Sequence, residues 1–350
     1  MKKVIAFVLS LVLLLSLTAC GKEAAAPTTA ATEAPTEAVV EVTEAPTEAP
    51  TEAPAPVSAN VMVLNGTTGF GMAALMDAAA NGEAALDYTF TVETDASNSV
   101  AALVNGSADI AALPTNAAAT VYNKTQGKVQ VLALNTLGVL YLVTDGSVTV
   151  ESMADLAGQT VYAPAQNPSF IFQHLVQANG LTDVTIDNTY AQPADLNTAV
   201  ASGEVAIAVL PEPMVTVAKS KNPNLKVALD LTEEWDKVSE PGSLVQGCVV
   251  VRKEFAEANT EAVKSFLNEY EASIDALVND VQGTAAKIDA TGIFTKAAVA
   301  AKAIPNCNVC FITGPEMQEA LSQFLTIMHG VAPASVGGSI PGDDFYCILG

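Results

Sequence analysis

Positively charged residues are scarce in this sequence. Its 350 residues include 15 lysines and arginines against 38 aspartates and glutamates, a formal net charge of −23 at pH 7, and Arg252 is the only arginine. A nucleic-acid-binding protein needs a positive surface that neutralises phosphates, so we expect no nucleic-acid partner. A site that clamps an anion with several arginines is excluded for the same reason.

Residues that bind metals are also few. His174 and His329 are the only histidines, which is too few for a histidine-rich zinc site. Cys307 and Cys310 form a single CxxC motif, and the other cysteines do not provide the second pair that a zinc ribbon requires. These two thiols either form a local disulfide or stay free and buried. We therefore expect neither a metal site nor a cofactor.

A hydrophobic segment begins the chain. Two lysines precede the apolar run 4–17, which is shorter than the roughly 20 residues of a membrane-spanning helix and has the pattern of a signal peptide. Residues 17–21 (LTACG) then match the bacterial lipobox, whose cysteine receives acyl chains such as palmitate. We predict a signal peptide at 1–19 and lipidation at Cys20, with a plain secretory signal and a chance cysteine as the alternative. Lipidation would anchor the protein to the extracellular face of the bacterial cell membrane.

The next segment, 20–58, is rich in proline. It holds four copies of the tetrapeptide TEAP, one at 32–35 and three within 43–54. Prolines at this spacing prevent helix and sheet, so we expect an extended, disordered linker that reaches up to ~100 Å. The body, 59–350, keeps 31 acidic and 12 basic residues, a net charge of −19. Most of the acidity therefore belongs to the folded part.

Four short apolar strands recur along this body, at 61–64, 108–113, 160–163 and 205–210. Each is followed by a polar or proline-containing loop and an amphipathic helix, which is the pattern of an α/β fold. In open α/β sheets, ligands bind at the carboxyl ends of the strands, where helix N-termini present free N–H groups. We therefore expect the binding residues in these four loops.

The four units divide into two pairs, which predicts one binding wall on each of two lobes. The apolar runs 133–144 and 247–252 are expected to be the two crossings between the lobes. The predicted ranges are 59–144 plus 247–350 for lobe I and 145–246 for lobe II.

This arrangement resembles the extracellular solute-binding proteins of ABC importers, and most closely the group for nitrate, sulfonates, taurine and thiamine precursors. The motifs that carry the resemblance are the lipobox, the loop at 65–71, LVNGSADIA at 103–111, LAGQTVY at 156–162, and ASGEVAIA at 201–208 leading to LPEP at 210–213. The resemblance implies a two-lobed, periplasmic-binding-protein-like (type II) fold with a two-strand hinge. It also implies a monomer that captures a small-molecule solute and delivers it to an ABC permease and its ATPase.

The predicted cleft residues lie in the loops that follow the strands. They are Thr67, Thr68, Phe70, Thr115 and Asn116 from lobe I, Gln166, Asn167 and Glu212 from lobe II, and Asn135 at the cleft floor. Threonine and asparagine at such positions serve equally well as helix caps. Phe70 either stacks on a planar ligand or lies in the core. The single tryptophan, Trp235, is expected to be a surface or lobe-packing residue, with contact to the ligand as the alternative.

Glu212 discriminates among ligands. A carboxylate in the cleft opposes an anion but accepts hydrogen bonds from an amine. With no arginine placed to neutralise an anion, we predict a small polar organic solute that is neutral, zwitterionic or amine-bearing, such as a pyrimidine-like vitamin precursor. A sulfonate such as taurine, or nitrate, bound by helix N-termini is the alternative.

Two other classes of protein use this fold. An enzyme needs a convergent acid–base or nucleophilic set. Glu212 has no histidine or cysteine partner in the predicted cleft, so we expect no enzymatic activity. A receptor accessory would keep the cleft but signal through a partner protein instead of a permease.

Overall fold

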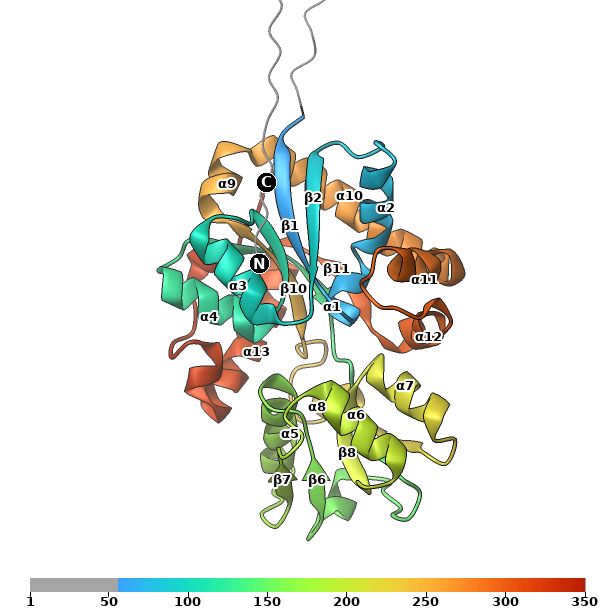
Figure 1. The fold of residues 1–350 in the computed structure, drawn as a ribbon. Coiled ribbons are helices and arrows are strands. Elements are labelled where there is room, and N and C mark those ends of the chain that lie inside the picture. The colour runs from blue at the N-terminus through green and yellow to red at the C-terminus, as the bar shows by residue number, and fades with distance from the viewer. Residues whose placement is uncertain (1–55, 350) are drawn as a thin grey trace, which may run out of the picture. The chain divides into compact units, whose positions relative to one another are not determined.

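The structure, a computed structural model, describes residues 56–349, which belong to one compact unit of the chain. The predicted signal peptide, Cys20 and nearly all of the predicted linker lie outside the described residues. Within 56–349, no helix is both long enough and apolar enough to cross a membrane. Strands and helices alternate along this part of the chain (Figure 1), which confirms the predicted α/β class.

The sheet of lobe I has six strands: β1 (Ser58–Leu64), β2 (Asp87–Glu93), β3 (Ile110–Pro114), β4 (Val129–Thr136), β10 (Gly247–Arg252) and β11 (Val309–Ile312). Their order is β11-β4-β10-β3-β1-β2. β1 pairs in parallel with β2 and β3, whereas β10 is antiparallel to both β3 and β4. The four strands β1 to β4 therefore end at the same edge of the sheet. The predicted strands 61–64 and 108–113 are confirmed as parts of β1 and β3.

The sheet of lobe II has five strands: β5 (Leu140–Thr144), β6 (Thr160–Tyr162), β7 (Thr185–Asp187), β8 (Ile207–Pro211) and β9 (Lys226–Asp230). Their order is β7-β6-β8-β5-β9. β6 is parallel to β7 and β8, while β5 runs antiparallel to β8 and β9. The predicted strands 160–163 and 205–210 are confirmed as β6 and β8, with small shifts at their ends.

Helices cover both faces of each sheet. Side chains alternate between the two faces of a strand, and along β3 Ala111 and Leu113 join one buried cluster while Ile110 and Ala112 join the other. The helices of lobe I are α1 (Thr67–Phe70), α2 (Ala73–Ala80), α3 (Ala96–Asn105), α4 (Thr115–Thr125), α9 (Lys253–Ala258), α10 (Thr260–Asn279), α11 (Val281–Ala290), α12 (Ala297–Ala303), α13 (Gly314–Val331) and the short η2 (Ile304–Asn306), η3 (Pro333–Val336) and η4 (Asp343–Phe345). Those of lobe II are η1 (Met153–Leu156), α5 (Asn167–Ala178), α6 (Pro193–Ser202), α7 (Met214–Lys221) and α8 (Leu231–Asp236).

The chain crosses between the sheets twice. The first crossing is short: β4 ends at Thr136 and β5 begins at Leu140, so only residues 137–139 connect them. In the second crossing the chain returns to lobe I: it leaves α8 after Asp236 and enters β10 at Gly247. The prediction that 247–252 is itself a crossing is wrong, because all of β10 pairs between β3 and β4 inside the sheet of lobe I.

The two lobes share a packed core on one side. Trp235 of α8 is completely buried, and its ring lies 4.7 Å from that of His174 and 5.9 Å from that of Phe324 on α13. The indole Nε1–H donates to Ser243 Oγ at 2.9 Å. Of the placements considered for Trp235, namely surface, lobe packing and ligand contact, the structure shows packing between the lobes.

A buried ion pair joins three strands of lobe I at the edge of the sheet where β1 and β3 begin. Asp109, directly before β3, is only 6% exposed, and its Oδ1 pairs with the Arg252 guanidinium at 2.8 Å. Its Oδ2 accepts from the backbone N–H and the side-chain amide of Asn60 at 2.9 and 3.1 Å. The aspartate of the LVNGSADIA motif therefore joins β1, β3 and β10, and Arg252 has a structural role.

This ion pair leads to a first prediction. We expect Asp109→Ala to lower the free energy of unfolding by about 3 kcal/mol, because the variant leaves a mostly buried guanidinium and the N–H groups of Asn60 without their acceptor. Urea unfolding followed by circular dichroism measures the change.

Glu254→Ala is the matched control, since Glu254 pairs with the same arginine at 3.0 Å but its side chain is 88% exposed. Its loss should cost no more than about 0.5 kcal/mol. Equal effects of the two variants would contradict the assigned role of the buried pair.

Candidate functional site

The carboxyl ends of the lobe I strands meet at one edge, beside the first crossing. Gly247, the first residue of β10, lies between Pro114 at the end of β3 and Thr136 at the end of β4. The loops that begin α1 and α4 follow β1 and β3 directly. The predicted lobe I residues are therefore gathered at this edge.

The carboxyl ends of the lobe II strands face the same crossing. Leu140, the first residue of β5, pairs with Pro211, the last residue of β8, and the Glu212 N–H donates to the Val139 carbonyl at 2.9 Å. Because only 137–139 separate the two sheets along this strand, the two carboxyl edges lie opposite each other. The helix N-termini of both lobes consequently point toward one interlobe region.

Two of the predicted lobe I side chains hold this edge together. The Asn135 amide donates to the Thr68 carbonyl at 3.1 Å and accepts from the Thr136 hydroxyl at 3.0 Å. The Thr115 hydroxyl donates to the Val245 carbonyl at 2.8 Å, which joins α4 to the return crossing. Thr115 and Asn135 are buried, so their first contribution is to position the loops.

The side chains of the remaining predicted lobe I residues differ in how exposed they are at this edge of the sheet. Thr67 and Asn116 are mostly buried in the first turns of α1 and α4, and Thr68 is half-buried. Phe70 is completely buried and packs edge-to-face on Phe294, with ring centroids 6.2 Å apart. Of the two roles considered for Phe70, the structure shows the core, because the ring has no exposed surface on which a planar ligand could stack.

Asn167 is the notable residue of the lobe II wall. It begins α5 and is 7% exposed, yet its Oδ1 has no hydrogen-bond partner among the described residues. The preceding Gln166 is exposed and has a left-handed φ of 68°. A buried acceptor without a donor costs about 1–3 kcal/mol. A donor supplied by water or by a ligand would remove that cost.

Glu212 lies at the bottom of a cavity of about 510 Å³ between α7 and α12. Its carboxylate accepts from the backbone N–H and the hydroxyl of Thr216 at 3.0 and 2.9 Å. Burial raises the pKa of Glu212 above its ordinary value, and hydrogen bonds from Thr216 and Asn306 together with the charge of Lys219 oppose the rise only in part. The other residues around the cavity are Tyr141, Val215, Lys219, Ser220, Val227, Lys302 and Asn306.

Sequence reasoning missed the residues that come to Glu212 from elsewhere in the chain. The Tyr141 hydroxyl donates to the Asn306 carbonyl at 2.9 Å, across the two lobes. The Asn308 side chain donates to the Gly138 carbonyl at 2.6 Å, and the Leu137 N–H donates to the Asn308 carbonyl at 3.0 Å. Residues 306–308 thus brace the first crossing, and only their position directly after the alanine-rich α12 could have suggested it.

Both cysteines of the CxxC motif are free thiols, and Cys307 directly follows Asn306, which lines the cavity. Cys307 is buried, and its Sγ–H donates to the Ala303 carbonyl at 3.1 Å. Burial, and next the negative charge of Glu212, raise the pKa of the Cys307 thiol well above its ordinary value. Cys307 is therefore a cysteine neighbour of Glu212 that the sequence did not reveal, but it stays protonated and is a poor nucleophile.

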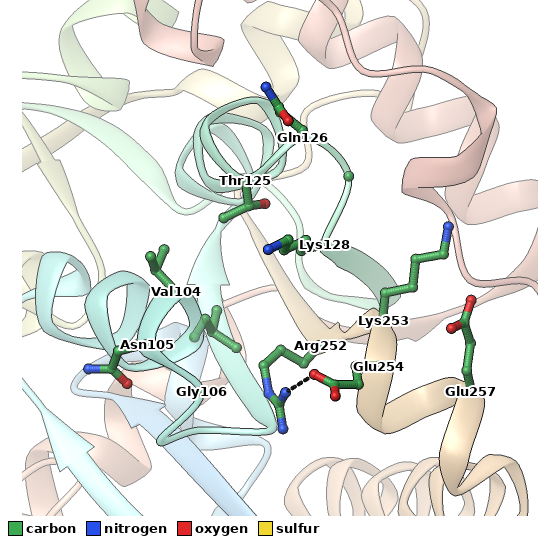
Figure 2. Close-up of a pocket in the computed structure, with 12 residues that line it drawn as sticks. Val104, Asn105, Gly106, Thr125, Gln126, Lys128, Arg252, Lys253, Glu254 and Glu257 are labelled. Carbon is green, nitrogen blue, oxygen red and sulfur yellow. Dashed lines mark hydrogen bonds and ion pairs between the residues drawn. The ribbon is translucent and has the colours of Figure 1, made fainter.

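A second cavity of about 470 Å³ lies at the other edge of lobe I, beside the C-terminal ends of α3 and α4 and the start of α9. Figure 2 shows Arg252 in it, paired with Glu254, together with Lys128 and Lys253. Arg252 and Lys128 lie near the C-terminal ends of α3 and α4, where the helix dipole favours a cation, whereas Lys253 is the first residue of α9. None of the predicted cleft residues lines this cavity.

Comparisons with known proteins agree with this geometry. A sequence model of the family described as NMT1/THI5 like matches residues 82–283. No curated protein is similar enough in sequence to count as a match. Three solved structures have folds similar to that of this chain.

The first is an ABC transporter structure from Parabacteroides distasonis, 23% identical with a TM-score of 0.71, covering 83% of this chain and 99% of that chain. The periplasmic aliphatic sulphonate binding protein SsuA from Escherichia coli is 15% identical with a TM-score of 0.65, covering 81% and 96%. A Candida albicans protein described as having the generic periplasmic binding protein fold is 11% identical with a TM-score of 0.52, covering 82% and 92%. These similarities confirm the predicted periplasmic-binding-protein-like fold.

The environment of Glu212 gives a second prediction. Because its pKa is higher in the folded than in the unfolded chain, the folded state binds the proton more tightly. The free energy of unfolding should therefore fall as the pH rises from the ordinary value of 4.5 through the raised value. In Glu212→Gln this contribution disappears, so the wild type should lose more stability than the variant between about pH 4 and pH 7.

Denaturant unfolding midpoints across this pH range measure the difference. Glu319→Gln on α13 is the control, because Glu319 is exposed and should leave the wild-type pH profile unchanged. A profile of Glu212→Gln that runs parallel to the wild type would show that Glu212 contributes nothing to the pH dependence.

Proposed function

Because the chain belongs to the NMT1/THI5-like family, whose sequence model matches more than half of it at residues 82–283, we propose that it is the extracellular solute-binding component of an ABC importer. One observation carries the proposal: the carboxyl edges of two α/β sheets lie opposite each other across a crossing of three residues. Each edge presents helix N-termini and polar loops, the arrangement in which open α/β folds bind ligands.

A solute held between these edges would couple binding to closure. A ligand shifts an equilibrium between open and closed forms only when it interacts differently with the two forms. A solute that contacts both walls meets this condition, since the second wall reaches it only on closing. A permease can then recognise the closed, loaded form. The predicted boundary at residue 144 is wrong, because β5 (Leu140–Thr144) pairs with β8 and β9 in the sheet of lobe II. The proposed lobes are therefore 59–139 with 247–350 and 140–246.

We propose an amine-bearing polar solute, with a pyrimidine-like compound preferred. Two buried acceptors belong to the predicted lobe II wall: Asn167 Oδ1, which has no partner among the described residues, and the Glu212 carboxylate. An N–H donor satisfies both, whereas an anion satisfies neither. Arg252 lies at the opposite edge of lobe I and is held by Asp109, so no arginine neutralises an anion here.

A sulfonate is the second candidate. It is favoured by the similarity to SsuA of Escherichia coli, which is named as an aliphatic sulphonate binding protein. The first turn of α5 would present free N–H groups to such an anion. The proposal is a binding protein in either case, since Glu212 and the protonated Cys307 do not form an acid–base or nucleophilic set.

A third prediction concerns the solute. In calorimetric titrations of the purified protein, the amine-bearing member of each pair should bind more tightly: 4-aminopyrimidine over pyrimidine, and taurine over ethanesulfonate. Asn167→Ala should weaken this binding by about tenfold, the effect of losing one good hydrogen bond.

Gln177→Ala is the control on the same helix, because Gln177 lies in the exposed C-terminal part of α5. It should bind as the wild type does. Micromolar binding of ethanesulfonate or nitrate, with no binding of an amine-bearing compound, would favour the anion candidate and overturn the amine.

We also propose that the protein acts as a lipid-anchored monomer at the extracellular face of the cell membrane. Tethering raises the concentration of the binder near its permease without requiring new contacts. The lipobox at 17–21 supports this proposal. A receptor accessory would share the anchor, and co-purification with a permease and its ATPase would separate the two roles.

A fourth prediction tests the anchor. Cys20→Ser removes the thiol that forms the thioether bond to the lipid, so the protein should move from the membrane fraction to the soluble fraction of the cells. Partition into the detergent phase and the intact mass measure the loss of acyl chains. Cys310→Ser should leave the membrane fraction unchanged, and persistence of Cys20→Ser in the membrane would contradict lipidation.

A further inference from the structure

The cavity between α7 and α12 is built by both lobes. Glu212, Thr216 and Lys219 come from lobe II, whereas Lys302 and Asn306 come from lobe I. Its volume of about 510 Å³ lies within the range of cavities that hold small organic ligands. A molecule in this cavity touches both lobes at once.

The bottom of the cavity is a carboxylate with spare hydrogen-bonding capacity. Glu212 is 4% exposed, and of the four acceptor positions that a carboxylate offers, Thr216 occupies two. A buried carboxylate is costly unless a positive group compensates it, and the charge of nearby Lys219 offsets the effect of burial on Glu212 only in part. An ammonium group of a ligand supplies that charge together with up to three donors.

The rim of the cavity carries the opposite charge. Lys219 and Lys302 are exposed, and neither forms an ion pair with an acidic group of the described residues. Each lies in the last turn of its helix, where the dipole favours a cation. The helix dipole explains why each lysine stands at the end of its own helix. It does not explain why the two lysines, from opposite lobes, border the same cavity.

The charge of the whole body narrows the ligand further. With a net charge of −19 on residues 59–350, the field around the protein disfavours the approach of a simple anion. A zwitterion has no net charge and escapes this penalty, while its two ends still meet charges of opposite sign inside the cavity.

We infer that the α7–α12 cavity binds a zwitterion, with its ammonium group at Glu212 and its carboxylate between Lys219 and Lys302. This inference rests on the proposed solute-binding function and names the class of solute within it. The lysines then explain how an anionic end is held without arginine. Because one lysine belongs to each lobe, the carboxylate also bridges the lobes, which favours the closed form.

The test is calorimetry on the full-length protein with glycine, β-alanine, 4-aminobutyrate and 6-aminohexanoate, which space the two charges progressively. One member should bind best, and at least about tenfold more tightly than the amine or the acid that lacks its other end, such as butylamine or butyrate for 4-aminobutyrate. Taurine against β-alanine then separates a sulfonate from a carboxylate at the lysine end.

Three variants assign the two ends. Lys219→Met and Lys302→Met should each weaken the best amino acid about tenfold and leave binding of the matching amine unchanged. Glu212→Gln should weaken both compounds, with circular dichroism confirming that it folds. Lys221→Met is the matched control, because Lys221 also lies in the last turn of α7 but does not line the cavity.

The outcomes separate this inference from the proposed function. If the amine binds as tightly as the amino acid and both cavity lysine variants behave as the wild type, the zwitterion site is wrong while amine binding stands. If no member of the series binds but 4-aminopyrimidine does, the zwitterion site is again wrong. If no solute of either panel binds, the proposed function fails with it.

Discussion

The crossing at residues 137–139 determines where a ligand can meet the protein. It joins the last residue of β4 to the first residue of β5, so two carboxyl edges face each other. The crossing is braced on both sides: the Gln246 side chain accepts from the Val139 N–H at 2.8 Å, and Asn308 donates to the Gly138 carbonyl at 2.6 Å. A Cβ on Gly138 would collide with Thr232 and lie 2.7 Å from Leu244. Glycine is therefore required here for close packing.

Local units of the chain were readable from the sequence, and contacts between distant segments were not. β3 and β8 are apolar runs ended by proline-containing loops, so their positions follow from nearest neighbours. The cavity around Glu212 depends on Lys302 and Asn306, which reach it only after the chain has returned to lobe I. Phe70 shows the same limit: its position in the loop after β1 left stacking on a ligand and packing in the core both open, and its contact with the distant Phe294 decides for the core.

The charged residues also show that composition can be read from the sequence, whereas their positions in the fold cannot. The single arginine argued against a bound anion, and its position at Asp109 agrees with that argument for arginine. Lys219 and Lys302, however, are two ordinary lysines in an acidic chain, and nothing in their sequence neighbourhoods distinguishes them. Only the packing of α7 beside α12 brings them to one cavity. The lack of further arginines therefore excludes a clamp built from arginines. It does not exclude a bound anionic group, because lysines can hold one.

The two sides of the interlobe contact differ in a way that constrains closure. On the side of α13, Trp235 and Phe324 belong to one continuous buried cluster that spans both lobes. On the side of α7 and α12 the lobes enclose a cavity. Separating the packed aromatic rings would expose apolar surface at about 25 cal/mol per Å², whereas narrowing the cavity exposes none. A rotation that keeps the packed side in contact moves the two rim lysines relative to each other, so the cavity is the part of the contact that a bound solute can control.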